Sequence, residues 1–132
     1  MAISRAARCS AGLFLLLGAF QGALVGGAPW GEASWGGQNR DTLPTSLRIA
    51  SFASLVLALT MAALVSGRLH VPIRRTKLFN GLLVFFVLSI AMNAASRSSV
   101  ERLIWVPYGI IQLATVWLAR QHERSSVESR NR

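Results

Sequence analysis

The sequence of 132 residues has little of what soluble enzymes use: one cysteine, two histidines and only five acidic residues. A single cysteine excludes an internal disulfide scaffold. Without a CxxC pair or a histidine–carboxylate cluster, the chain offers no pattern for a metal site. Charged residues make up 14% of the chain, whereas soluble proteins have about 25%. The shortage of charge and its uneven distribution exclude a disordered chain and an ordinary soluble enzyme.

The charged residues divide the chain into four long uncharged segments, which are residues 9–31, 49–67, 78–96 and 103–119. A helix rises about 1.5 Å per residue, so roughly 20 residues cross a hydrocarbon core of about 30 Å. Helices satisfy their own backbone hydrogen bonds in lipid. The sequence therefore predicts an all-α membrane protein, a four-transmembrane-helix bundle with helices at about residues 10–28, 48–67, 78–96 and 101–119. These helices form one domain over residues 1–120, followed by a polar cytoplasmic tail over residues 121–132.

The basic residues predict how the chain is threaded through the membrane. Ten lie before the first segment, in the second loop or after the last segment: Arg5, Arg8, Arg68, Arg74, Arg75, Lys77, Arg120, Arg124, Arg130 and Arg132. Four lie on the other side: Arg40, Arg48, Arg97 and Arg102. Because basic loops stay in the cytoplasm, we expect a multi-pass protein of the cell membrane with both termini cytoplasmic. The positive charge of these segments also favours contact with anionic lipid headgroups. The sequence contains no known nucleic-acid-binding motif beside these basic residues.

The first segment also resembles a secretory signal peptide, since Arg5 and Arg8 precede an apolar stretch over residues 13–20. A small-residue cleavage site would end at Ala28, but Pro29 follows it directly and disfavours processing. We therefore expect the segment to be retained as a helix. Cleavage would leave three helices with the same orientation, and the mass of the purified chain distinguishes the two alternatives.

Small residues recur at helical spacing in the first two segments. Gly18, Gly22 and Gly26 form a double GxxxG motif, which lets a neighbouring helix approach closely. In the second segment small residues occupy every fourth position: Ala50, Ser54, Ala58, Ala62 and Ser66. We expect the first two helices to pack together through these faces. The same motif also fits a seam in a homo-oligomer or with a membrane-protein partner.

Several polar side chains lie inside the apolar segments, in the predicted outer half or near the midplane: Gln21, Ser89, Asn93, Tyr108 and Gln112. Because an unpaired polar group is costly in lipid, these side chains should face the bundle interior. They either form hydrogen bonds between helices or line a small polar pocket that opens outward. No carboxylate, lysine or histidine lies within the four segments, which argues against a proton relay. We expect no catalytic residues and no cofactor.

The first outer loop, residues 27–41, is the most distinctive part of the chain. Its glycines and Pro29 predict turns rather than a helix. Trp30 and Trp35 suit the headgroup layer of a membrane, and Trp105 would join them on the outer side. The loop is predicted either to anchor the chain at the membrane surface or to fold over the polar pocket, with Glu32 and Arg40 as its polar contacts.

Two outer motifs carry a resemblance. The loop contains APWG and WGG, and residues 92–107 contain MNAASRS, then ER and Trp105-x-Pro107. Together they resemble a group of small four-helix bacterial membrane proteins that has no assigned activity. The resemblance covers most of the four-helix region and implies that the two outer segments form one feature. Within the second motif, Ser98 and Glu101 fit a capping box at the start of the fourth helix.

The predicted function is the binding of a small molecule or lipid in an outward-facing pocket. The predicted binding residues are Gln21, Trp30, Glu32, Trp35, Arg40, Asn93, Arg97, Glu101, Tyr108 and Gln112. The alternative is a structural or accessory subunit that assembles with another membrane protein through the glycine motif. A membrane enzyme ranks third, since Glu32, Asp41 and Glu101 are its only outer carboxylates. Small multidrug exporters match the size, but the membrane-embedded acid is missing here.

Overall fold

The computed structural model describes residues 3–130 and is all-helical. Its long helices are α1 (Arg5–Gly26), α2 (Thr45–Val65), α3 (Arg75–Ala94) and α4 (Ser99–Arg130). All four contain a stretch long and apolar enough to cross a membrane. At about 1.5 Å per residue, α1, α2 and α3 each match a hydrocarbon core of about 30 Å. The helices thus fit a multi-pass membrane protein, as the uncharged segments predict.

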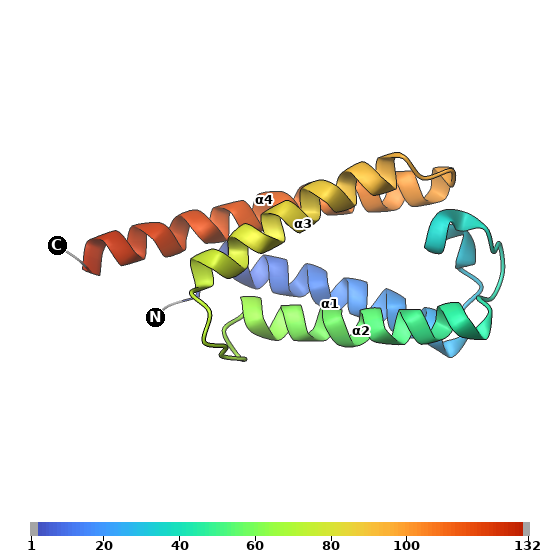
Figure 1. Ribbon diagram of the computed structural model, residues 1–132, viewed down its shortest axis with the longest axis horizontal. Helices are drawn as coiled ribbons and strands as arrows, with labels where there is room; N and C mark the ends of the chain where they lie inside the picture. The colour runs from blue at the N-terminus through green and yellow to red at the C-terminus, as the bar shows by residue number, and fades with distance from the viewer. Residues whose placement is uncertain (1–2, 131–132) are drawn as a thin grey trace.

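The helices form two hairpins, α1 with α2 and α3 with α4 (Figure 1). Contacts between α1 and α4 join the hairpins, whereas the described residues of α2 and α3 have little direct contact. The start of α1, the connection from α2 to α3 and the C-terminal end of α4 lie at one end of the bundle, here called the termini end (Figure 1). The opposite end carries residues 27–44 and the turn before α4, and is called the loop end.

The helix bounds differ little from the predicted ones, except at the two ends of the chain. α1 begins five residues earlier than predicted. The reason is an N-cap, because the Ser4 hydroxyl accepts a hydrogen bond from the Ala7 N–H at 3.1 Å. The other starts, and the ends of the first three helices, lie within three residues of the predicted positions.

The C-terminal end of α4 differs more from its predicted position. The sequence predicts a polar tail from residue 121, whereas α4 continues to Arg130. No glycine or proline interrupts residues 120–130, so nothing in the local sequence ends the helix. Glu123 on this extension is buried and pairs with Arg75 of α3 at 2.8 Å. The extension is therefore held by contact with the rest of the bundle.

The outer surface of the bundle is apolar. More than half of the surface of Leu16, Ile49, Val84 and Leu103 is exposed, and these residues come from all four helices. Exposed apolar surface of this extent is unusual for a soluble monomer. It suits contact with hydrocarbon chains.

The packed core lies toward the termini end. Val65, Phe79 and Val116 are fully buried there. Phe14 and Phe86 extend this cluster along the bundle, with ring centres 5.8 Å apart. Farther toward the loop end, the two hairpins leave cavities between them.

The first two glycines of the GxxxG motif face α2. A Cβ added at Gly18 would lie 3.5 Å from Leu55 and 3.5 Å from Leu59, and one at Gly22 would lie 3.8 Å from Leu55. At Gly26 a Cβ would meet nothing within 4 Å. There is room for a methyl group between the helices at the first two positions, but not for a longer side chain.

Replacing Gly18 and Gly22 together by leucine is expected to lower the melting temperature in detergent. The added side chains have no room between α1 and α2, and overpacking costs about 1–3 kcal/mol per site. Gly12→Leu is the matched control, because Gly12 is exposed on α1 and a Cβ there meets nothing within 4 Å. Equal melting of the double variant and the control would contradict this packing.

Candidate functional site

The connection between α1 and α2 is an ordered loop that closes the loop end. It contains two short 3₁₀ turns, η1 (Gly31–Ala33) and η2 (Trp35–Gly37). The Gly31 N–H donates to the Asp41 carbonyl oxygen at 3.0 Å, which draws the two sides of the loop together. A Cβ at Gly31 would overlap the carbonyl oxygens of Asn39 and Asp41. The turn therefore requires a glycine at this position.

The first turns of α4 hold one side of the loop. The Glu101 carboxylate accepts a hydrogen bond from the Gly36 N–H at 2.9 Å, and the Trp105 indole N–H donates to the Ala33 carbonyl oxygen at 2.6 Å. Glu101 is only 6% exposed. The loop and the start of α4 thus form one feature, joined largely through backbone groups of the loop.

Helix α2 holds the other side of the loop. The Trp35 indole N–H donates to the Ser51 hydroxyl at 3.0 Å. Arg48 donates through Nη2 to the Val25 carbonyl oxygen at 2.6 Å, which satisfies an acceptor in the last turn of α1. Because it is tied to both α2 and α4, the loop extends across the space between the two hairpins.

The start of α4 follows the predicted capping box only in part. The Ser98 hydroxyl accepts from the Glu101 N–H at 3.2 Å, as predicted. The Glu101 side chain does not return to the Ser98 N–H, and instead accepts from Gly36 and from the Ser96 hydroxyl. The reason is burial, since a carboxylate removed from water needs several donors.

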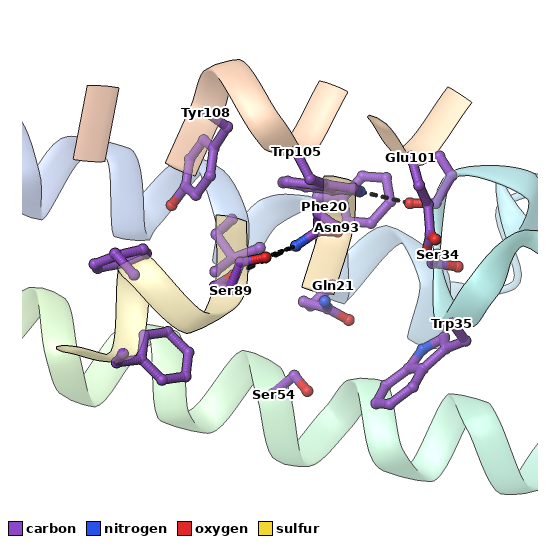
Figure 2. Close-up of a pocket in the computed structure, with 14 residues that line it drawn as sticks. Phe20, Gln21, Ser34, Trp35, Ser54, Ser89, Asn93, Glu101, Trp105 and Tyr108 are labelled. Carbon is purple, nitrogen blue, oxygen red and sulfur yellow. Dashed lines mark hydrogen bonds between the residues drawn. The ribbon is translucent and has the colours of Figure 1, made fainter. Parts of the chain in front are cut away.

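Beneath the loop lies a cavity of about 220 Å³, here called the polar cavity (Figure 2). Its polar lining consists of Gln21, Ser34, Ser54, Ser89, Asn93 and Glu101. Its aromatic lining consists of Phe20, Trp35, Phe85, Phe86, Trp105 and Tyr108. All four long helices and the loop contribute to these walls.

One polar atom at this cavity has no partner within the described residues. The side-chain oxygen Oε1 of Gln21 is buried and accepts no hydrogen bond. Its neighbours are already engaged, since Asn93 Nδ2 donates to the Ser89 carbonyl oxygen at 2.8 Å (Figure 2), and the Ser54 hydroxyl donates to Ala50. A buried acceptor without a donor is destabilising, so a bound O–H or N–H group would be favoured here.

Half of the predicted binding residues line the polar cavity: Gln21, Trp35, Asn93, Glu101 and Tyr108. They come from α1, the loop, α3 and α4. The Tyr108 hydroxyl donates to the Leu13 carbonyl oxygen at 2.9 Å, so its ring forms a fixed part of the wall. Four separate segments of the chain therefore meet at one place.

The other five predicted residues do not line this cavity. Trp30 is about half exposed and stacks on Phe20 with ring centres 5.9 Å apart. Glu32, Arg40 and Arg97 are exposed at the loop end. Glu32 contacts the start of α4 only through its backbone, since its carbonyl oxygen accepts from the Ser98 hydroxyl at 2.7 Å. The other contacts of the loop are made through Gly36, Ala33 and Trp35 rather than Arg40.

Gln112 lies deeper than predicted. It is completely buried, and its Nε2 donates to the Ser10 carbonyl oxygen at 3.2 Å. The amide therefore connects α4 to α1 beyond the end of the polar cavity. This contact is the hydrogen bond between helices that the sequence leaves open as the alternative role.

Several lining residues are absent from the predicted site, among them Phe20, Ser54 and Trp105. From the sequence alone, Trp105 is expected at the membrane interface. Its spacing from Glu101 and Tyr108, at i, i+4 and i+7, was the available sign that the three share a helix face. Ser54 belongs to the small-residue repeat of α2, and no local signal separates that role from a place on the cavity wall.

The lining is suited to binding. Its hydroxyls and amides donate and accept hydrogen bonds, and its carboxylate holds the loop. Within this lining no nucleophile is paired with a base. Among residues 3–130, no three His, Cys, Asp or Glu side chains come together in a group that could hold a metal ion. Comparisons with protein-family models, curated proteins and solved structures found no match.

Proposed function

We propose that the protein is a membrane-embedded binding protein that holds one small amphipathic molecule or lipid in the polar cavity. The observation that carries this proposal is the unpartnered Gln21 oxygen at a cavity of about 220 Å³ beneath the loop. Binding sites for small molecules combine apolar walls with a few convergent polar groups. Aromatic rings and the Gln21 and Asn93 amides give this cavity that composition.

The proposed orientation places the loop end outside the cell and both termini in the cytoplasm of a cell-membrane protein. Among residues 3–130, nine basic residues belong to the segments at the termini end and four to those at the loop end. This distribution supports the orientation through the preference of basic loops for the cytoplasm. The polar cavity would then face outward, with the bilayer surrounding the helices.

The alternative of an accessory subunit has less support. Gly18 and Gly22, the first two glycines of the motif, already face α2 of the same chain. Within the motif, a Cβ has open space around it at Gly26 alone. The glycine motif is therefore used largely within the chain.

The test is native mass spectrometry of the protein purified in mild detergent, comparing wild type with Asn93→Leu. A defined bound species in wild type is expected to be lost in Asn93→Leu, because leucine replaces an amide on the cavity wall. Asn80→Leu is the matched control, since Asn80 is on the same helix and lines neither cavity. An empty wild-type protein, or a species that Asn93→Leu retains, would contradict the proposal.

A further inference from the structure

A second cavity, of about 490 Å³, lies between α2 and α3. It is here called the apolar cavity, because side chains such as Leu57, Met61 and Leu82 form most of its lining. Phe14 of α1 also contributes to the wall. The volume lies within the roughly 300–1,000 Å³ of small-molecule sites.

The two cavities are adjacent and share part of their walls. Leu17, Gln21, Ser54 and Phe85 line both of them, and Figure 2 shows Gln21 and Ser54 on the side of the polar cavity that faces α2. The combined space has a polar part beneath the loop and a longer apolar part toward the termini end. Gln21, whose side-chain oxygen has no partner within the described residues, lines both cavities.

The apolar cavity has access to the surrounding membrane. α2 and α3 have little direct contact over their described residues. Leu57 of α2 and Phe85 of α3 both line the cavity, and each is 53% exposed. In a bilayer, these residues face hydrocarbon, so a ligand can enter sideways between the two helices without passing the loop.

We propose that the combined cavity binds a single-chain lipid with an uncharged, hydroxyl- or amide-bearing headgroup. The headgroup lies beneath the loop, where it donates a hydrogen bond to Gln21 Oε1, and the hydrocarbon chain lies between α2 and α3. This inference rests on the proposed function and specifies its ligand class.

The residues that line the polar cavity determine which headgroup charge it can bind. No arginine, lysine or histidine lines the polar cavity, and its Glu101 carboxylate is occupied by the loop. An ionised headgroup would thus be buried without a partner, which is strongly unfavourable. Lys77 lines the far end of the apolar cavity, so an anionic headgroup would have to bind there, in the reverse orientation.

The apolar cavity can be filled by a single substitution. Gly81 lines only this cavity, and a Cβ there meets nothing within 4 Å. The first side-chain atom of Gly81→Phe is therefore accommodated on the wall of the proposed chain site, and the ring is expected to compete with the hydrocarbon chain for this space. Gly12→Phe is the matched control, because Gly12 is equally unobstructed and lines neither cavity.

The experiment titrates 1-monooleoylglycerol, an uncharged single-chain lipid with two hydroxyls, into the detergent-solubilised protein and counts bound molecules by native mass spectrometry. One molecule is expected on wild type and on Gly12→Phe. Gly81→Phe is expected to weaken binding by about tenfold or more, the size of a typical overpacking penalty. Melting temperatures for both variants verify that they fold. Asn93→Leu is also expected to weaken binding.

The two proposals fail in different ways. Loss of binding in Asn93→Leu but not in Gly81→Phe would overturn the chain site and leave the polar cavity as the binding site. Unchanged binding in Asn93→Leu with loss in Gly81→Phe would overturn the headgroup position. No binding by wild type would overturn the ligand class. Tighter binding of oleoyl lysophosphatidylglycerol than of 1-monooleoylglycerol, abolished by Lys77→Gln, would show the reverse orientation with an anionic headgroup.

Discussion

Arg75→Ala is expected to lower the free energy of unfolding by about 1.5–3 kcal/mol, the typical contribution of a hydrogen bond to a charged group, because its ion pair with Glu123 is only partly buried. Arg75 lies at the start of α3 and donates through Nε to the Glu123 carboxylate at 2.8 Å. Its Nη1 and Nη2 atoms donate to the carbonyl oxygens of Leu64 at 3.1 Å and Val65 at 2.9 Å. One guanidinium therefore connects α2, α3 and α4 at the termini end.

Two separate costs follow from the loss of Arg75. The buried Glu123 carboxylate loses its cationic partner. The Val65 carbonyl oxygen, at the C-terminal end of α2, loses its donor, and such a group has no partner within its own helix. The Leu64 carbonyl oxygen keeps the Gly67 N–H as a donor at 3.1 Å. Both costs are specific to the position of the guanidinium and do not depend on the net charge of the chain.

Unfolding by SDS in mixed micelles measures this effect. Arg74→Ala removes the same charge from the neighbouring, exposed residue and should be close to wild type. Arg75→Lys should be intermediate, because an ammonium group cannot reproduce the planar, forked geometry of the guanidinium. Arg75→Ala combined with Glu123→Ala should cost less than the sum of the two single changes. Equal stability of Arg74→Ala and Arg75→Ala would show that the contacts around Arg75 contribute nothing.

The helices could be predicted because the membrane imposes two strict physical limits. Charge is costly in hydrocarbon, so Arg48, Arg68, Lys77 and Arg97 mark where the uncharged segments end, and the bilayer thickness fixes their length. Outside the hydrocarbon neither limit applies. The helical extension of α4 was missed for this reason, since its residues are polar and its pairing of Glu123 with Arg75 joins distant parts of the chain.

The candidate site could be predicted only where a side chain carries the signal. Gln21, Asn93 and Tyr108 are polar residues within apolar segments, so their inward orientation follows from the cost of exposing them to lipid. The loop contacts could not be found in this way, because Gly36 and Ala33 use backbone groups that every residue has.

How far the cavity extends along the bundle could not be predicted from the sequence either. Gln112 follows Tyr108 by about one helical turn on the same face of α4. It is nevertheless buried against α1 rather than placed on the cavity wall. Whether two hairpins touch or separate at a given level depends on how all their side chains pack together, and periodicity within one helix does not contain that information.

Glu101→Ala is expected to release the loop from α4. The carboxylate accepts hydrogen bonds from the Gly36 N–H and the Ser96 hydroxyl in a buried position. A hydrogen bond to a charged group contributes about 1.5–3 kcal/mol, and only the one from Gly36 joins Glu101 to the loop, so its loss should favour opening by roughly 10–10²-fold. The loop covers the polar cavity, so its release should also shorten the residence time of a bound ligand.

Hydrogen exchange of the loop amides, followed by mass spectrometry in detergent, measures this opening directly, because exchange reports the free energy of local unfolding. Glu101→Gln should lie between wild type and Glu101→Ala, since it keeps an oxygen that can accept from Gly36 but loses the charge. Glu32→Ala is the matched control, because it removes the same charge from an exposed position in the same loop. If Glu101→Ala exchanged no faster than Glu32→Ala, the other loop hydrogen bonds, from Trp105, Trp35 and the Ser98 hydroxyl, would be sufficient to hold the loop closed.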